Sequence, residues 1–351
     1  MFELIKTIIY FSIVLTVIVA VHEYGHYFVA KKCGVKVLTF SIGFGKKIFS
    51  FKNKVGEIWQ LCCLPLGGYV KMFGDDNASG AVGYKKNPTK DDLAYSLIYK
   101  HPFKKILVAA AGPAMNYIFA ILLFFFVFAV KGKPFVAPVV NGIQQESVAE
   151  KIGLQKGDKL IAINGVQMSA FEDIRKGLDS QKDDNVSVVV QRSGQIMTLT
   201  GEHKQGDILG VMGGQPNYKN VSKSEALTMS FAETTNITTG TLKALWNIIY
   251  HHGSTKGIGG PIMIAKQSAK AGEGGFFTFL YFMACISVSL GLVNILPIPL
   301  LDGGHVVVNF IELVTRRRVS NKVYKAMVYV GIVIIALLMG LGFFNDIFVN
   351  R

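Results

Sequence analysis

Cysteine is scarce in this chain: four stand among 351 residues, at positions 33, 62, 63 and 285. They include no CxxC pair, and their density is far below that of a disulfide scaffold, which argues against a small disulfide-stabilised fold. A thiolate zinc site is the alternative, but the adjacent side chains of Cys62 and Cys63 would point to opposite faces of a strand. We therefore expect all four cysteines to be packing residues.

Charged residues are also few, at 17% of the chain, while half of all residues are hydrophobic and the mean hydropathy is +0.38. These values are high for a soluble globular protein and favour a membrane protein. Acidic residues are in the minority, 23 against 37 Lys and Arg, so the formal net charge is +14. Nucleic-acid binding would require this excess to form one stripe, whereas the charges follow the links between apolar runs.

Four long runs lack Asp, Glu, Lys and Arg, apart from Glu23 in the first. A helix of about 20 residues crosses the hydrocarbon core of a bilayer, so each run predicts a membrane-spanning helix. A cleaved signal peptide is the alternative for the first run, but that run continues into HEYGH without a clear small-residue cleavage site. The runs are Thr7–Ala30, Ile106–Val130, Phe276–Leu301 and Ala326–Phe344.

Basic residues gather in two of the links between these runs. Residues 31–105 contain 14 Lys or Arg against 5 Asp or Glu, and residues 316–325 contain five basic residues and no acidic one. Such links are typically cytoplasmic, because positive charge is retained on that side of the membrane. With four crossings, both termini and residues 131–275 are then expected on the opposite side.

Two other regions have β patterns. Glu57–Met72 has apolar patches broken by Pro65, Gly67 and Gly68, which is typical of a hairpin; it either re-enters the membrane beside a site or is ordinary cytoplasmic structure. Residues 134–204 contain short β-rich runs separated by turn signals and predict a small soluble domain. These runs are Val136–Val140, Lys159–Ile163 and Val186–Gln191.

Ser224–Tyr250 has the spacing of an amphipathic helix. Such a helix lies on the membrane face or packs against the soluble domain, and the pattern leaves both open. Its apolar positions are Leu227, Phe231, Leu242, Leu245, Trp246 and Ile249.

The sequence HEYGH in the last turns of the first apolar run has the HExxH pattern. Positions i and i+4 share a helix face, so His22 and His26 can bind one zinc ion while Glu23 reaches the water at that ion. Zinc lowers the pKa of water towards about 7, and a carboxylate can accept the proton as the water attacks a peptide carbonyl. The alternative is a set of polar residues at a helix end, but burying them in a membrane without a partner costs several kcal/mol.

A catalytic zinc site needs a third protein ligand, and Asp302 is the candidate. It follows the third apolar run, where Pro297 and Pro299 must break the helix at membrane depth. The first and third runs both cross inward, so His26 and Asp302 are expected near the same side of the membrane. The alternative role for Asp302 is as the N-cap of a following helix.

Taken together and in order, six motifs resemble the bacterial site-2 protease family, specifically its regulator of sigma-E protease group (RseP). The match covers nearly the whole chain, and the combination is far more specific than any one motif. The motifs are HEYGH, FSIGFG at Phe40–Gly45, LPLGGYVKM at Leu64–Met72, GPAMN at Gly112–Asn116, GGPI at Gly259–Ile262 and NILPIPLLDGGH at Asn294–His305.

The resemblance implies roles for individual residues. His22, His26 and Asp302 would be the zinc ligands and Glu23 the catalytic acid-base residue. Asn294 would contact the substrate backbone or polarise its scissile carbonyl. The segment with Gly67 and Gly68 would be a membrane-associated β-hairpin that aligns an unwound substrate by strand addition.

The resemblance also implies the fold, location and partners. The expected fold is a multi-pass α-helical membrane protein with a small periplasmic α+β PDZ-like domain, located in a bacterial inner membrane. Family members cleave single-pass transmembrane proteins, such as anti-sigma factors, and signal-peptide remnants; membrane lipids are the other expected partner, and nucleic acid is not. Only one PDZ-like module fits here, whereas longer members have two. The expected divisions are a membrane core at 1–133, the PDZ-like domain at 134–204, an amphipathic connector at 205–275 and a second membrane core at 276–351.

Other interpretations explain less of the sequence. A metal transporter would place polar residues in several spans, but the second and fourth runs are almost wholly apolar. A membrane-held PDZ scaffold would leave HExxH and Asp302 unexplained. His305 either supports the zinc site or is an interfacial histidine without metal contact. Asn116 either supports the zinc site or forms a hydrogen bond between helices. His251 and His252 are adjacent and do not share a helix face.

Overall fold

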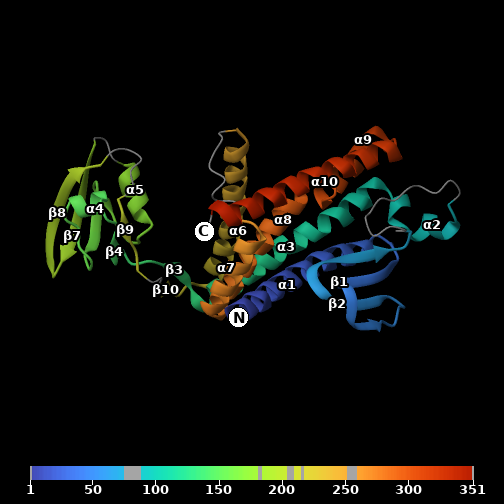
Figure 1. Cartoon of the computed structure of the whole chain (residues 1–351), viewed down its shortest axis with the longest axis horizontal. Coiled ribbons are helices and arrows are strands. Elements are labelled where there is room, and N and C mark those ends of the chain that lie inside the picture. The colour runs from blue at the N-terminus through green and yellow to red at the C-terminus, as the bar shows by residue number, and fades with distance from the viewer. Residues whose placement is uncertain are drawn as a thin grey trace. The chain divides into compact units, whose positions relative to one another are not determined.

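The computed structural model describes residues 2–74, 88–180, 184–203, 209–214, 217–250 and 259–349. The chain forms two compact units, one of Met1–Val127 with Leu227–Arg351 and the other of Phe128–Ala226. The first unit is mainly helical, and its long helices α1, α3, α8 and α10 run side by side (Figure 1). Its elements are α1 (Phe2–Lys32), β1 (Val37–Lys52), β2 (Ile58–Met72), α2 (Lys90–Tyr95), the 3-10 turn η1 (Leu97–Tyr99), α3 (Pro102–Lys131), α6 (Lys223–Tyr250, which begins in the other unit), α7 (Pro261–Glu273), α8 (Phe276–Ile295), α9 (Asp302–Thr315), α10 (Asn321–Phe344) and the π-helical η3 (Asn345–Val349).

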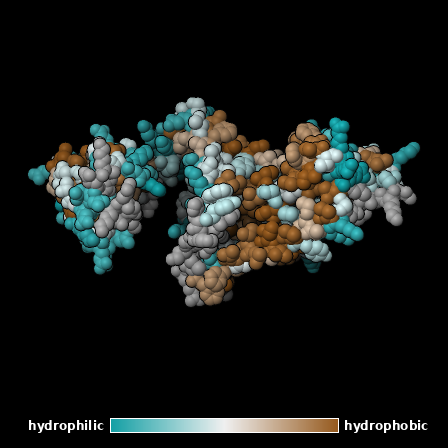
Figure 2. Space-filling model, turned by 90° about the horizontal axis from the view of Figure 1, so that it is seen from above, coloured by the Kyte–Doolittle hydropathy of each residue, from teal (hydrophilic) through white to brown (hydrophobic). Residues whose placement is uncertain are grey.

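Four helices are long and apolar enough to cross a membrane, which confirms the four predicted spans. Many of their apolar side chains are exposed, and Figure 2 shows a broad hydrophobic surface over the helical unit. Such a surface is unfavourable in water but matches a lipid environment. The spans are Phe2–Lys32, Pro102–Lys131, Phe276–Ile295 and Lys322–Phe348.

Helices α1, α3 and α8 pack closely around a small apolar core. Val14 and Ile18 of α1 are buried against Met283 of α8. Further along, a Cβ atom on Gly25 would overlap the carbonyl oxygen of Ala111, so the backbones of α1 and α3 are in contact there. Small residues permit this approach between membrane helices. It brings α3 against the HExxH turn of α1.

Strands β1 and β2 form a sheet that packs on α1. Residues 39–42 of β1 pair on both sides, with residues 58–61 and with residues 68–71 of β2. The prediction that Glu57–Met72 forms a hairpin by itself is therefore wrong, because β1 lies between its two halves. The side chain of Tyr27 on α1 contacts the rings of Phe40 and Trp59 at centroid distances of 5.7 and 5.2 Å, which holds the sheet on the helix.

Helix α6 confirms the predicted helix at 224–250 and buries its polar face. Ser230 and Thr234 are buried, while Leu227, Phe231 and Trp246 are exposed in the described structure. This arrangement is the reverse of a helix packed into a soluble core. It favours the membrane-facing interpretation over packing against the soluble domain.

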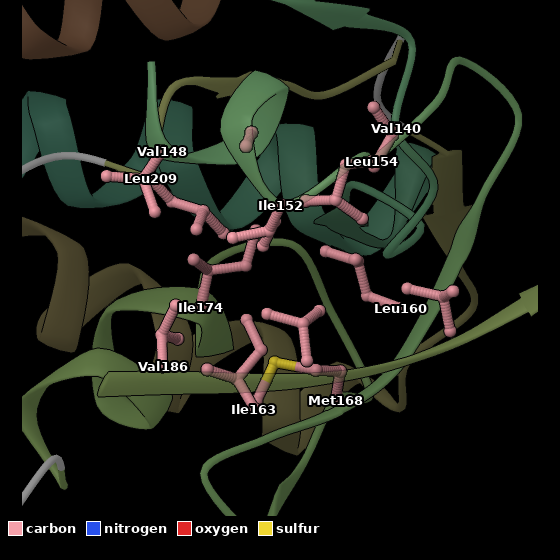
Figure 3. Packing of buried hydrophobic residues seen from close by; sticks show 13 residues of the cluster. Val140, Val148, Ile152, Leu154, Leu160, Ile163, Met168, Ile174, Val186 and Leu209 are labelled. Carbon is pink, nitrogen blue, oxygen red and sulfur yellow. The ribbon is translucent and has the colours of Figure 1, made fainter. Parts of the chain in front are cut away.

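The second unit is a small α+β domain. A four-stranded sheet has the order β6-β5-β7-β8, and two short pairs, β4 with β9 and β3 with β10, complete it. Branched side chains of β5 and β7, such as Leu160 and Val186, point into one buried cluster (Figure 3). The elements are β3 (Lys133–Phe135), β4 (Gly142–Ile143), α4 (Val148–Lys151), β5 (Lys159–Ile163), β6 (Val166–Gln167), α5 (Asp173–Asp179), β7 (Asn185–Arg192), β8 (Gln195–Glu202), β9 (Val211–Met212) and β10 (Asn217–Lys219).

Two details of this unit differ from the sequence analysis. Val136–Val140 is not a strand and makes one isolated bridge at Val139, because Pro138 has no N–H to donate to a ladder. The unit also extends past residue 204, since Leu209 belongs to its buried core and β9 pairs with β4. The strands predicted at Lys159–Ile163 and Val186–Gln191 correspond to β5 and to most of β7.

Candidate zinc centre

Three side chains from opposite ends of the chain converge in the helical unit. The Nε2 atoms of His22 and His26 lie 3.2 Å apart. The carboxylate of Asp302 lies 3.0 Å from Nε2 of His22 and 3.4 Å from Nε2 of His26. The exposed fractions of these side chains are 9%, 12% and 20% in that order. Two imidazoles and one carboxylate are the ligand set of a catalytic zinc site that keeps a fourth position open.

The loop between α8 and α9 delivers Asp302 to the histidines. Prolines 297 and 299 prevent α8 from continuing, and the loop folds back onto the first turn of α9. A Cβ atom on Gly303 would overlap the carbonyl oxygen of Leu296, so only glycine fits there. The N-cap residue of α9 is Leu301. The alternative role of Asp302 as an N-cap is therefore wrong, and its carboxylate faces His22 and His26 instead.

Helix α3 covers the histidine pair through a residue that the sequence analysis did not assign. A Cβ atom on Gly112 would overlap Nε2 of His26 and would lie 2.7 Å from Nε2 of His22. The missing side chain thus leaves room at the point where the donor atoms meet. A glycine inside an apolar helix, here in the GPAMN motif, is the signal that indicates such a close approach.

Both histidines have a second contact on α3. Nδ1 of His26 lies 2.8 Å from the carbonyl oxygen of Val108, which can only accept, so a neutral ring that donates there keeps its Nε2 lone pair available for a metal ion. Nδ1 of His22 lies 3.2 Å from the side-chain nitrogen of the fully buried Asn116. Outer contacts of this kind fix the ring orientation of metal ligands. Asn116 thus lies where a supporting residue of the site would be expected.

Glu23 lies beside the pair and faces the sheet. It follows His22 directly on α1 and is half-buried. A Cβ atom on Gly68 would lie 3.0 Å from Cγ of Glu23, so the backbone of β2 passes next to this carboxylate. The neighbouring Gly67 has φ +140°, and a side chain there would overlap the ring of Phe44. Gly68 therefore allows β2 to approach Glu23, and Gly67 allows β2 to pass the ring of Phe44.

A buried acidic residue holds the sheet against the end of α1. Glu57 is 5% exposed, and its carboxylate accepts hydrogen bonds from Tyr27 Oη at 2.8 Å and Asn53 Nδ2 at 2.7 Å. Lys31 Nζ lies 2.9 Å away. Burial alone would raise the pKa of Glu57, but these three partners together hold it below its ordinary value. The charged form therefore fixes the sheet one turn from His26.

Other residues singled out from the sequence lie in varied surroundings. Asn294 is half-buried in the last turn of α8, and His305 lies on α9 with its ring 6.3 Å from that of Tyr324. Cys33 and Cys62 are buried, as expected of packing residues. Cys63 is exposed, so the prediction that it is a packing residue is wrong. Residues 251 and 252, the adjacent histidines, lie outside the described residues.

A family model of peptidase family M50 matches residues 10–338, which is nearly the whole chain. The chain belongs to peptidase family M50. It is 33% identical to a predicted zinc metalloprotease of Agrobacterium fabrum, covering 97% of this chain and 95% of the relative. Predicted zinc metalloproteases of Mesorhizobium japonicum and Campylobacter jejuni are also 33% identical, covering 97% and 95% of this chain and 98% and 91% of the relatives.

Membership of M50, the site-2 protease family, makes this protein a membrane-embedded zinc metalloprotease. The three convergent side chains fit that metal. Their donor atoms lie within 4.8 Å of one another, and they combine nitrogen and carboxylate ligands of the kind that zinc prefers. Among the described residues, this is the group of His, Cys, Asp and Glu side chains that could hold a metal ion.

Proposed function

We propose that this M50 enzyme hydrolyses peptide bonds within the transmembrane segments of single-pass membrane proteins. The observation that carries the proposal is the convergence of His22, His26 and Asp302 beside Glu23 on a helix long enough to span a membrane. A peptide bond that reaches this site must lie at membrane depth. Anti-sigma factors and signal-peptide remnants are the substrate classes that the family resemblance suggests.

The roles of the residues follow from their chemistry. His22, His26 and Asp302 would hold the zinc ion, which supplies Lewis-acid chemistry by polarising a carbonyl and making water more acidic. Glu23 accepts a proton from water as the water oxygen forms a bond to the scissile carbonyl carbon. When the C–N bond breaks, the same carboxyl group returns the proton to the leaving amine nitrogen. Asn294 is proposed to hold the substrate backbone or polarise its carbonyl.

The sheet offers a way to present an extended substrate. The 68–71 half of β2 pairs with residues 39–42 of β1 along one edge, and it runs next to Glu23 at Gly68. A substrate strand added along the other edge would pass the catalytic carboxylate. A helical substrate must first unwind there, because its amides are engaged within the helix. Gly67 and Gly68 are thus proposed to contact the substrate.

The proposed location is a bacterial inner membrane. The bias of basic residues towards residues 31–105 and 316–325 supports a cytoplasmic position for these links. The soluble unit would then be periplasmic. Its small α+β architecture supports a single PDZ-like domain, and with it the regulator of sigma-E protease group.

The decisive experiment compares the native enzyme with Glu23→Gln. Each purified enzyme is incubated in detergent with a single-pass membrane protein as substrate, and cleavage of that substrate is measured. The zinc content of each enzyme is measured by elemental analysis. Glu23→Gln should retain zinc and lose cleavage by at least about 100-fold, since general acid-base catalysis contributes that much or more. A chelator should abolish cleavage by the native enzyme, and added zinc should restore it.

Two outcomes would contradict the proposal. Undiminished hydrolysis after metal removal would exclude the zinc mechanism. Equal cleavage by native enzyme and Glu23→Gln, at equal zinc content, would exclude Glu23 as the proton carrier.

A further inference from the structure

The helical unit contains a pocket that is distant in sequence from the HExxH turn and strongly basic. Its volume is about 320 Å³, and it lies between the η1–α3 junction and the end of α9. Five Lys or Arg side chains line it, against one acidic side chain. These lining residues are Lys100, Lys105, Arg316, Arg317, Arg318 and Glu312.

The one acidic residue is engaged in building the pocket. Glu312 lies 2.7 Å from Nζ of Lys105, and both side chains are at most 10% exposed. The same carboxylate accepts a hydrogen bond from the backbone N–H of Val319 at 3.0 Å. Glu312 therefore joins α3 to the link between α9 and α10. Lys105 neutralises its charge, so the carboxylate does little to offset the other cations.

Among the described residues, three of the other cations make no ion pair that would cancel their charge at the pocket. Within the described part of the chain, Lys100, Arg316 and Arg317 take part in no salt bridge, and Nζ of Lys100 donates to the carbonyl oxygen of Ala94 at 2.5 Å. The guanidinium of Arg318 lies 5.8 Å from the ring centre of Tyr99. A concave surface lined in this way attracts an anion, and guanidinium groups match the geometry of phosphate oxygens.

The position of the pocket favours an anion that belongs to a lipid. Helix α3 begins at Pro102 and α10 begins at Asn321, and both belong to candidate spans, so the pocket lies where these helices leave the hydrocarbon. Exposed apolar side chains stand beside it, with Phe103 in the first turn of α3 and Val314 in the last turn of α9. Acyl chains can contact these side chains while the phosphate lies in the pocket.

We propose that this basic pocket binds the phosphate group of an anionic phospholipid. Arg316 and Arg317 contact the phosphate, and the Lys105–Glu312 pair holds the walls together. The site is separate from the zinc ligands and has no part in the hydrolytic step. Lipid bound there would connect the start of α3 with the link that follows α9.

The test measures binding of short-chain phosphatidylglycerol to the purified full-length protein in detergent, by native mass spectrometry. The pocket variant is Arg316→Gln with Arg317→Gln. The matched control is Lys322→Gln with Lys325→Gln, which removes the same charge from two exposed residues in the first turns of α10 that do not line the pocket. Zinc content and melting temperature report whether each variant is folded.

The apparent affinity should fall about 30-fold in the pocket variant and less than about threefold in the control, because each nearby basic residue contributes about fivefold. Equal losses in both variants would reduce the effect to general charge and overturn the proposal. Unchanged binding by a folded pocket variant would also overturn it. Inorganic phosphate and phosphatidylcholine are added as competitors. Weak competition by inorganic phosphate supports a lipid source, and weak competition by phosphatidylcholine supports a requirement for a net negative headgroup. Displacement at equal concentration by inorganic phosphate would overturn the lipid assignment, and displacement by phosphatidylcholine would overturn the anionic assignment.

Discussion

Asn116 has one polar atom without a partner, and this suggests how His22 is oriented. Its side-chain nitrogen lies 3.2 Å from Nδ1 of His22, while its Oδ1 is buried without a hydrogen-bond partner among the described residues. A neutral imidazole that binds metal through Nε2 carries its proton on Nδ1 and needs an acceptor. Turning the amide by half a rotation provides Oδ1 as that acceptor. Oxygen and nitrogen of an amide are assigned from such networks.

Asn116→Ala should therefore weaken zinc binding by about 10- to 100-fold, because the ring of His22 loses its fixed orientation. Competition with a chelating dye measures this affinity directly. Ser287→Ala is the control, since the hydrogen bond of Ser287 Oγ goes to the backbone carbonyl of Asn116, at 2.9 Å, and not to its side chain. If both variants bind zinc as the native protein does, Asn116 only packs α3 against α8.

Gly112→Ala should abolish zinc binding, because its methyl group would occupy the space between the two Nε2 atoms. Gly340→Ala on α10 is the matched control, since a Cβ atom there has no heavy atom within 4 Å. Both changes favour a helix by about 1 kcal/mol, so a difference in zinc content between the variants reports on the site alone. Full zinc content in Gly112→Ala would mean that α3 does not cover the metal position.

The sequence predicted the residues that converge, because HExxH is a local pattern and the proline-broken third run leads to Asp302. It left Asn116 open as a supporting residue and did not predict the other contacts that fix them. Gly112 and Val108 lie on a helix that meets α1 only in the folded protein, and no local spacing indicates which residue of α3 faces His26. The roles of Glu23 and Asn294 stay predictions until activity is measured.

At the scale of elements, the second unit is held partly by one ion pair whose carboxylate is buried. Arg192 on β7 donates to both carboxylate oxygens of Asp158 at 2.7 Å, and Asp158 is 1% exposed. These hydrogen bonds hold the pKa of Asp158 below its ordinary value of 3.8, although burial opposes them. A lowered pKa stabilises the fold above the ordinary value, and this stabilisation is lost as the pH falls towards the folded value.

The backbone amides of the second unit should therefore become less protected against hydrogen exchange below about pH 4. Asp158→Asn should reduce protection of β5 and β7 at neutral pH by about 1–3 kcal/mol and make it less dependent on pH. Hydrogen exchange followed by mass spectrometry on the full chain measures both effects. Lys176→Ala, which breaks the exposed pair with Asp173, should change this protection much less than Asp158→Asn does, because solvent screens an exposed ion pair. Equal effects of the two variants would contradict a special role for the Asp158–Arg192 pair.

Elements with their own periodicity were predictable, and elements defined by distant partners were not. The four spans and α6 follow from local apolar patterns. By contrast, the placement of β1 between the halves of β2 depends on pairing that local sequence does not specify. Helix α7 was missed as well: its first turn is capped by Asp346 from the far end of the chain, which accepts from the N–H groups of Gly260 and Ile262 at 2.8 and 2.9 Å.

At the scale of the whole molecule, the sidedness of the two soluble regions remains a prediction that native cysteine chemistry can test. Cys63 is exposed on β2, and Gln195→Cys would add a thiol at the start of β8. In intact spheroplasts, an impermeant maleimide should label the Gln195→Cys variant, because the second unit is expected to be periplasmic. It should leave the native protein unlabelled, because residues 31–105 are expected to be cytoplasmic. Permeabilised cells should show labelling of Cys63 in both. Labelling of the native protein in intact cells would reverse the assignment.

The proposed zinc ligands come from α1 and from the first residue of α9, which are far apart in the sequence, and this has a consequence during biosynthesis. A nascent chain that has inserted its early helices possesses both imidazoles but no carboxylate to complete the set. The ribosome must translate past Asp302 before the enzyme can hold its metal. Translation products that stop before Asp302 therefore lack the third ligand, and we expect them to be unable to cleave their membrane neighbours.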